Sequence, residues 1–236
     1  MWLPPGYASD KARRYPVLYL HDGQNVFDAQ AAGAEWQVDE TAQRLVASGA
    51  VAPMIIVAVS STSARLSDYT PVQQLRGADG LVGGGATAYG RYLVEELKPW
   101  VDAHYRTQPV RETTAVGGSS VGGLVSMWLL LEQPSTFGAA LVVSPAVWWG
   151  DHAVLRQVAD ARLSVPPPRV WVDIGGREGE EALQGARRLH EALRARGWPV
   201  AWLEVPAASH DEASWAARVE PMLRFLYGAP GVPSTR

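Results

Sequence analysis

Short apolar runs that alternate with longer helical patterns constrain the fold of this chain more than any other feature. Several of these runs are apolar almost throughout, which is typical of strands buried on both faces of a parallel sheet. Six strands are predicted on this basis, at residues 15–20, 54–60, 113–117, 140–143, 170–174 and 200–205. Because strands and helices alternate, we predict an α/β fold with a doubly wound, mostly parallel sheet and helices on both faces.

Five helical patterns lie between or after the predicted strands. They cover residues 36–48, 89–101, 121–131, 181–196 and 211–227. Pro99 should kink the second helix and Pro221 should interrupt the last, because proline donates no backbone hydrogen bond. The chain shows no internal repeat and no long linker, so we expect one domain that spans residues 1–236.

Composition excludes several kinds of protein. The chain has 236 residues, of which 47% are hydrophobic and 19% charged, and this is the composition of a globular protein. Its apolar runs fall short of the roughly 18–20 residues that a membrane helix needs. A net charge of -3 offers no basic surface for nucleic acid, so we expect neither nucleic acid nor a membrane as a partner. The absence of cysteine excludes disulfides, thiolate metal sites and cysteine nucleophiles.

The amino terminus does not have the pattern of a secretory signal. Residues 1–7 (MWLPPGY) carry no basic segment and no long apolar segment, and a strong predicted strand follows soon after. We therefore expect a cytoplasmic protein, and we leave open that an export sequence was removed upstream.

The most informative motif is Gly-x-Ser-x-Gly at residues 118–122, between a predicted strand and an unusually apolar predicted helix. Only one frame fits, because a frame that started at Gly117 would end on Val121. Ser120 is therefore the candidate nucleophile and Ser119 is a spacer. Small neighbours let a strained serine project its hydroxyl from a sharp turn, and the helix N-terminus offers N–H groups to an oxyanion. A glycine- and serine-rich turn without chemistry is the alternative.

The loop after the first predicted strand is the candidate second half of an oxyanion hole. An acyl-transfer site of this kind takes one oxyanion donor from the loop after an early strand. Residues 21–25 (HDGQN) occupy that place. Gly23 would let the backbone turn so that the Gln24 N–H points into the site. An ordinary strand-ending turn is the alternative here.

The candidate base is His210. In this fold the chain order is serine, acid, histidine, so the base is sought late in the sequence. His210 lies between the last predicted strand and the last helix, at a strand's carboxyl end, where α/β sheets carry their sites. His152 comes too early and His190 lies inside a charged helix. A surface histidine is the alternative for His210.

The candidate acid is Glu178, in the loop after the strand predicted at residues 170–174. Glu180 and Glu181 fit the first turn of the next helix, where the helix dipole stabilises acids. Asp173 lies inside the strand and is expected to be structural.

With these residues in place, the sequence resembles the esterase family of α/β-hydrolases that includes enterochelin and other siderophore esterases, S-formylglutathione hydrolases and mycolyltransferases. The resemblance covers nearly the whole chain. It rests on residues 3–7 (LPPGY), 15–25 (YPVLYLHDGQN), 68–71 (DYTP) and 118–123 (GSSVGG), on Ser144-Pro145 with Trp148-Trp149, on Asp173-x-Gly175-x-x-Glu178 and on the loop around His210. The stretch from Ser144 to Trp149 looks most like the branch that holds siderophore trilactone esterases.

The resemblance implies a catalytic triad of Ser120, Glu178 and His210, with an oxyanion hole formed by the backbone amides of Gln24 and Val121. It implies hydrolysis of a small-molecule carboxylic ester through an acyl-enzyme, with no metal or cofactor. An acyltransferase with the same triad and a non-catalytic binding module on this fold stay open as alternatives.

Two further expectations concern the edge of the sheet and the walls of the site. Family members usually carry one or two strands ahead of the segment at residues 3–7, whereas Met1 stands almost on top of it here, so we expect a sheet shortened at its N-terminal edge. Trp148 and Trp149 follow a predicted strand. We expect them either to wall the acyl or alcohol pocket or to pack in the core.

Overall fold

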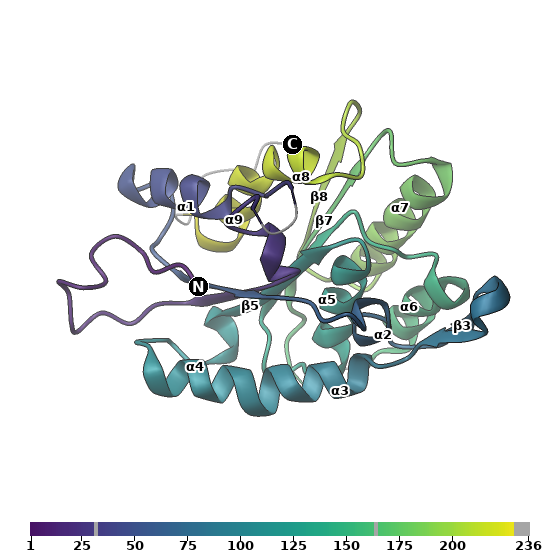
Figure 1. The fold of residues 1–236 in the computed structure, drawn as a ribbon, viewed down its shortest axis with the longest axis horizontal. Coiled ribbons are helices and arrows are strands. Elements are labelled where there is room, and N and C mark those ends of the chain that lie inside the picture. The colour runs from purple at the N-terminus through teal and green to yellow at the C-terminus, as the bar shows by residue number, and fades with distance from the viewer. Residues whose placement is uncertain (31–32, 163–164, 229–236) are drawn as a thin grey trace.

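The centre of the fold is a six-stranded parallel sheet in the order β2-β1-β5-β6-β7-β8 (Figure 1). The computed structural model describes residues 1–30, 33–162 and 165–228. The strands of this sheet are β1 (Val17–His21), β2 (Ile55–Val59), β5 (Thr114–Ser119), β6 (Ala139–Val143), β7 (Arg169–Gly175) and β8 (Val200–Val205). Every predicted strand is present with small shifts at its ends, and all neighbours in the sheet run parallel.

Strand β1 shows why the predicted strands are apolar on both sides. Val17 and Tyr19 join one hydrophobic cluster, whereas Leu18 and Leu20 join a second one. Successive side chains of a strand point to opposite faces of the sheet, so each cluster fills one face. Both faces are therefore covered, which confirms the predicted doubly wound arrangement.

Helices cover both faces of the sheet (Figure 1). One face packs against α1 (Val38–Ala47), α8 (Glu212–Ala216) and α9 (Val219–Tyr227). The other packs against α3 (Ala86–Arg91), the π-helical segment η3 (Tyr92–Leu97), α4 (Lys98–His104), α5 (Val121–Glu132), α6 (Trp149–Asp160) and α7 (Glu180–Ala195). Nearly all of α5 is buried, which explains why its sequence has no polar face.

Both predicted proline effects differ in detail from the structure. A π-helical segment ends just before α4, whose first turn contains Pro99, so the helix continues through the proline with a local change of winding. The helix predicted over residues 211–227 is two helices, and the break lies at Ala217 and Arg218. Pro221 falls in the first turn of α9, where a missing N–H costs no helical hydrogen bond.

Besides the short 3-10 turns, the described residues form elements that the sequence did not predict. They are α2 (Arg65–Asp68), α6, and a hairpin of β3 (Gln73–Leu75) and β4 (Leu81–Gly83). The start of α6 contains three consecutive left-handed residues, Gly150, Asp151 and His152, which hide its helical pattern. The strands of the hairpin are too short to give a readable alternation.

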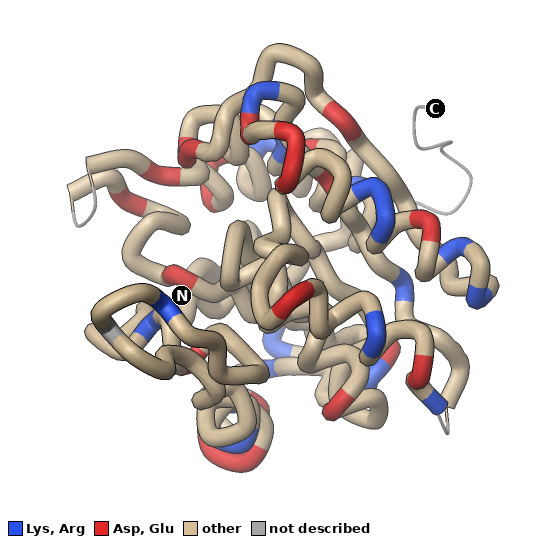
Figure 2. Tube along the Cα trace, turned by 90° about the vertical axis from the view of Figure 1, so that its right-hand side faces the viewer, with Lys and Arg blue, Asp and Glu red and all other residues tan. Residues whose placement is uncertain are grey.

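The carboxyl ends of the parallel strands gather the candidate residues at one edge of the sheet. The loops after β1, β5, β7 and β8 carry Gln24, Ser120, Glu178 and His210, and the strand order places these loops side by side. Basic and acidic residues are interspersed along the chain (Figure 2). In the part of the chain that the structure describes, no helix reaches the length and apolarity needed to cross a membrane.

Candidate active site

Ser120 occupies the sharp turn between β5 and α5. Its φ of 60° and ψ of -123° lie in a region that non-glycine residues rarely adopt. The Ser120 N–H donates to the Val143 carbonyl at 3.0 Å, and the Ser120 carbonyl accepts from Leu124 and Ala146, both at 3.0 Å. The backbone is held on both sides while the residue stays partly exposed. This is the geometry expected of a nucleophile elbow.

The glycines of the elbow are required by close packing. A Cβ atom on Gly123 would lie 2.8 Å from the Val143 carbonyl oxygen, and one on Gly118 would lie 3.1 Å from the side chain of His21. A Cβ atom on Gly122 would approach Asp22 Oδ2 to 3.4 Å. The elbow is therefore packed directly against the loop after β1.

That loop turns at Asp22, which has a φ of 56°. The Asp22 carboxylate accepts from Arg65 Nε at 2.6 Å and from Arg65 Nη2 at 2.7 Å, so a bidentate ion pair holds the turn. Gly23 is needed for a close approach, because a Cβ atom there would lie 2.6 Å from the carbonyl carbon of Ala58. The turning role that we predicted for Gly23 thus belongs to Asp22.

The backbone amides of Gln24 and Val121 lie on these two adjoining segments. Gln24 sits in η1 (Gly23–Asn25), a 3-10 helix of one turn. Its side chain is fixed by Ser61, with Nε2 donating to Oγ at 2.9 Å and Oε1 accepting from the Ser61 N–H at 3.1 Å. The Val121 N–H begins α5 and has no intrahelical acceptor. Within the described residues neither amide donates to a backbone carbonyl, so both can serve a ligand.

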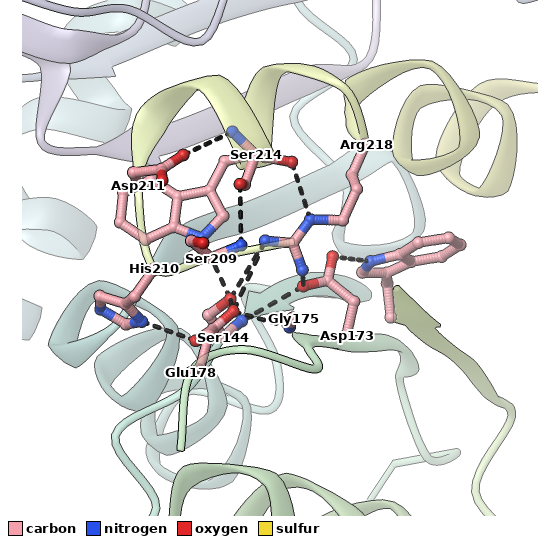
Figure 3. A network of polar contacts seen from close by, with 11 residues as sticks. Ser144, Asp173, Gly175, Glu178, Ser209, His210, Asp211, Ser214 and Arg218 are labelled. Atoms are coloured by element: carbon pink, nitrogen blue, oxygen red, sulfur yellow. Dashed lines mark hydrogen bonds and ion pairs between the residues drawn. The ribbon is translucent and has the colours of Figure 1, made fainter. Parts of the chain in front are cut away.

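Glu178 and His210 meet across two loops (Figure 3). His210 Nδ1 lies 2.6 Å from Glu178 Oε2; the Glu178 side chain is 0% exposed and that of His210 is 43% exposed. Asp211 follows His210 and caps α8 by accepting from the Ser214 N–H at 2.8 Å. The predicted acid and base are therefore brought together. In the described part of the chain Ser120 Oγ has no hydrogen bond to His210, a contact that unliganded sites often complete only with substrate.

The other carboxylate oxygen of Glu178 is held inside the protein. Oε1 accepts from the Gly175 N–H at 2.7 Å and from Ser144 Oγ at 2.6 Å, and Arg218 Nη2 lies 3.8 Å away. Ser144 follows β6, between the loops of Ser120 and Glu178, and has a positive φ of 42°. Three separate elements thus fix one carboxylate oxygen.

A buried ion pair lies beneath the acid. Arg218 Nη1 donates to Asp173 Oδ1 at 2.7 Å, and Trp171 Nε1 donates to Oδ2, also at 2.7 Å. Burial raises the pKa of Asp173 to about 6, although Arg218 and Trp171 pull it down. This position fits the structural role expected for Asp173.

Three other histidines, His21, His152 and His190, are engaged elsewhere. His21 is buried behind the elbow with Nδ1 2.7 Å from Tyr89 Oη, and burial lowers the pKa of His21 to about 4. His190 stacks on Trp202 at 5.0 Å between ring centroids. His152 Nε2 lies 2.7 Å from Arg188 Nη2. None of these three contacts Glu178.

The two tryptophans predicted near the site have different surroundings. Trp149 is buried in the core, and its Nε1 donates to the Val72 carbonyl at 2.8 Å. Trp148 is 37% exposed, and its ring centroid lies 5.7 Å from that of Trp149. Of the two roles weighed for these tryptophans, Trp149 therefore has the role of packing in the core. Trp148 remains accessible to solvent.

Sequence reasoning missed three residues of this region. Arg65 holds the loop after β1, Arg218 lies between Asp173 and Glu178, and Ser144 donates to Glu178. An arginine in a helix, as Arg65 is, or just before one, as Arg218 is, carries no local signal of a partner distant in sequence. Ser144 was noticed only as part of a Ser-Pro motif, without a role.

Comparison with known proteins identifies the family. The family described as "Putative esterase" matches residues 1–226. The chain is 30% identical over 199 residues to the ferri-bacillibactin esterase BesA of Bacillus subtilis, covering 76% of this chain and 66% of that protein. It is 25% identical to the uncharacterized protein YbbA of Bacillus subtilis, over 97% of this chain and 91% of that protein.

Solved structures share the fold. An IroE-like serine hydrolase from Shewanella oneidensis superposes with a TM-score of 0.77 at 23% identity, over 94% of this chain and 73% of that one. The enterobactin esterase FES from Shigella flexneri superposes with a TM-score of 0.75 at 20% identity, over 95% of this chain and 52% of that one. These likenesses show the α/β-hydrolase fold. By fold and family match together, the chain belongs to the Putative esterase family and is a carboxylic ester hydrolase.

Proposed function

We propose that the protein hydrolyses a small-molecule carboxylic ester through an acyl-enzyme, with Ser120 as nucleophile, His210 as general base and Glu178 as the acid of the triad. The observation that carries this proposal is the 2.6 Å contact between His210 Nδ1 and the buried Oε2 of Glu178. It lies at the same sheet edge as a serine with the strained backbone of a nucleophile elbow.

The first half of the reaction forms the acyl-enzyme. His210 Nε2 takes the proton of the Ser120 hydroxyl as Oγ attacks the ester carbonyl carbon. The N–H groups of Gln24 and Val121 donate to the oxygen that becomes negative. The tetrahedral intermediate then collapses, the bond to the alcohol oxygen breaks, and Nε2 returns the proton to the leaving alcohol.

The second half repeats the chemistry with water. His210 Nε2 removes a proton from water, the resulting hydroxide attacks the acyl carbon, and Ser120 leaves as the free hydroxyl when the proton is returned. In both halves an imidazolium forms next to the Glu178 carboxylate. Because Glu178 is buried, its charge stabilises that imidazolium more than an exposed carboxylate would.

The substrate class that we propose is a siderophore-type, aryl or short-chain ester. The support comes from the named activities of relatives, which include BesA, the endo-1,4-beta-xylanase/feruloyl esterase of Xylanibacter ruminicola and several siderophore esterases. The match covers 29% of the length of the Xylanibacter ruminicola protein.

A panel of esters tests the proposal directly. Purified protein is assayed on p-nitrophenyl esters, feruloyl esters and a catecholate trilactone, alongside the Ser120→Ala and Ser119→Ala variants. We expect Ser120→Ala to lose hydrolysis while its circular dichroism stays native, and Ser119→Ala to retain substantial activity. An active Ser120→Ala protein with an inactive Ser119→Ala protein would overturn the assignment of the nucleophile.

A further inference from the structure

The hydroxyl of Ser144 has three partners, and their chemistry fixes the direction of every hydrogen bond around it (Figure 3). Trp215 Nε1 lies 3.0 Å from Ser144 Oγ and Arg218 Nη2 lies 3.2 Å from it. Indole and guanidinium nitrogens only donate, so Ser144 Oγ must accept from both. Its own proton is then left for the third partner, Glu178 Oε1, at 2.6 Å.

The same logic continues into Glu178. Oε1 accepts from the Ser144 hydroxyl and from the Gly175 N–H at 2.7 Å, which occupies the oxygen that faces the interior. Oε2 is left for His210. A carboxylate that accepts at Oε2 requires a proton on His210 Nδ1, and a neutral imidazole with that proton has its lone pair on Nε2.

The partners of Ser144 are themselves immobile. Arg218 is 2% exposed and is fixed by Asp173 at 2.7 Å and by the Ser214 carbonyl at 3.0 Å. Trp215 is 6% exposed and packs against Trp36, with ring centroids 5.5 Å apart. Neither donor can turn away from Ser144 without breaking a buried contact, so the hydroxyl has one arrangement available.

We propose that Ser144 is a positioning residue for the triad: its hydroxyl, oriented by Trp215 and Arg218, donates to Glu178 Oε1 and so keeps Oε2 turned toward His210, where Oε2 holds the imidazole proton on Nδ1. This inference rests on the proposed function for its catalytic consequence. Its structural content, the effect of the Ser144 hydroxyl on the tautomer of His210, can be measured without any substrate.

Charged groups near His210 act on the imidazole as well. Glu178 faces it from the loop before α7, Arg218 lies behind Glu178 on the loop before α9, and Asp211 follows it in the chain. All of them are retained when only the Ser144 hydroxyl is removed. A change in the His210 tautomer after that removal therefore reports on the hydroxyl and not on a lost charge.

The test compares two variants that lack the hydroxyl with one matched control. Ser144→Ala removes only the hydroxyl, and Ser144→Gly also suits the positive φ of 42°, so it relieves backbone strain if the alanine variant folds poorly. Ser126→Ala is the control, because Ser126 is likewise buried and its hydroxyl donates one hydrogen bond, to the Gly122 carbonyl at 2.7 Å. The tautomer of His210 is read from long-range proton–nitrogen correlations on protein with ¹⁵N-labelled histidine, assigned with His210→Gln.

In the wild-type protein and in Ser126→Ala we expect a single tautomer with the proton on Nδ1. In both Ser144 variants the Glu178 carboxylate is free to turn away from His210, so we expect the half-exposed imidazole to sample both tautomers. We also expect a loss of kcat on the order of 10- to 100-fold with KM little changed, as for a misplaced catalytic group. A single Nδ1-protonated tautomer and near wild-type kcat in both Ser144 variants would overturn the inference, as would an Nε2-protonated tautomer in the wild-type protein. If the wild-type protein hydrolyses no ester, the proposed function fails, and the tautomer comparison still decides the inference.

Discussion

Replacing Arg218 by methionine should destabilise the protein strongly, because it leaves a buried carboxylate without its cation. Arg218 and Asp173 are 2% and 0% exposed, and their closest atoms are 2.7 Å apart. Breaking such a pair from one side typically costs about 3–5 kcal/mol, since the remaining charge stays desolvated. Arg218 also donates to Ser144 and to the Ser214 carbonyl. Because these hydrogen bonds are lost as well, we expect the free energy of unfolding to fall by about 3–5 kcal/mol and not by less.

The loss should depend on pH. Burial raises the pKa of Asp173 to about 6 even with Arg218 in place, and Arg218 lowers it, so the pKa in Arg218→Met must be higher still. A carboxyl whose pKa is raised in the folded state adds stability at low pH, and this stability is lost as the pH rises through the folded pKa. The deficit of Arg218→Met relative to wild type should therefore be smaller at pH 5 than at pH 8.

A double variant separates charge from packing. Asp173→Asn in the Arg218→Met background removes the unpaired charge while keeping an acceptor for Trp171, so the two substitutions should couple favourably by about 1–3 kcal/mol. Urea denaturation followed by circular dichroism, at pH 5 and at pH 8, measures the free energy of unfolding of the wild type, of Arg218→Met, of Asp173→Asn and of the double variant. An equal deficit at both pH values, with no recovery in the double variant, would refute the electrostatic reasoning and leave Arg218 a packing residue.

Three further predictions concern the site and its surroundings. Glu178→Gln should lower kcat by several orders of magnitude, as loss of a triad acid does elsewhere. Glu180→Gln and Glu181→Gln should keep near wild-type kcat, because both residues are exposed at the start of α7. A near-normal kcat for Glu178→Gln in steady-state assays would remove Glu178 from the triad. Because burial lowers the pKa of His21 to about 4, its neutral form supports the fold above its ordinary pKa of 6.5, and up to about 3 kcal/mol should be lost between pH 6.5 and 4. The contribution of His21 is isolated by measuring the free energy of unfolding of the wild type and of His21→Gln as a function of pH. Parallel curves for the two proteins would contradict the prediction. Short acyl esters should be better substrates than long-chain lipids, because the sequence has no long apolar insertion to form a lid; a chain-length series that peaks at long acyl groups would count against this.

The strands and the elbow could be predicted because their causes are local. Each parallel strand is buried on both faces, so its own residues are apolar, as in β1. The Gly-x-Ser-x-Gly turn needs small residues at fixed spacing, because a Cβ atom on Gly118 would lie 3.1 Å from the carbonyl carbon of Gly122 in the same turn. Glu178 was separated from Glu180 and Glu181 because it is nearest to the strand end and the other two fit the first turn of a helix.

The residues that support Glu178 could not be predicted, because their contacts join segments that are distant in the sequence. Ser144, Asp173 and Arg218 are far apart in the chain and meet only after the sheet forms, so no pattern within a short window marks them. The left-handed residues at the start of α6 concealed a helix for a similar reason, since contacts outside the segment hold them. One is a hydrogen bond from the Gly150 N–H to Gln74 Oε1 at 2.9 Å.

Covalent labelling of the nucleophile tests the central claim most directly. The protein is treated with a fluorophosphonate, which phosphonylates an activated serine, and the modified peptide is sequenced by mass spectrometry. We predict a single adduct on Ser120 that forms much more slowly in His210→Gln. An adduct on Ser119 or another serine, or labelling of Ser120 at the same rate without His210, would contradict the account.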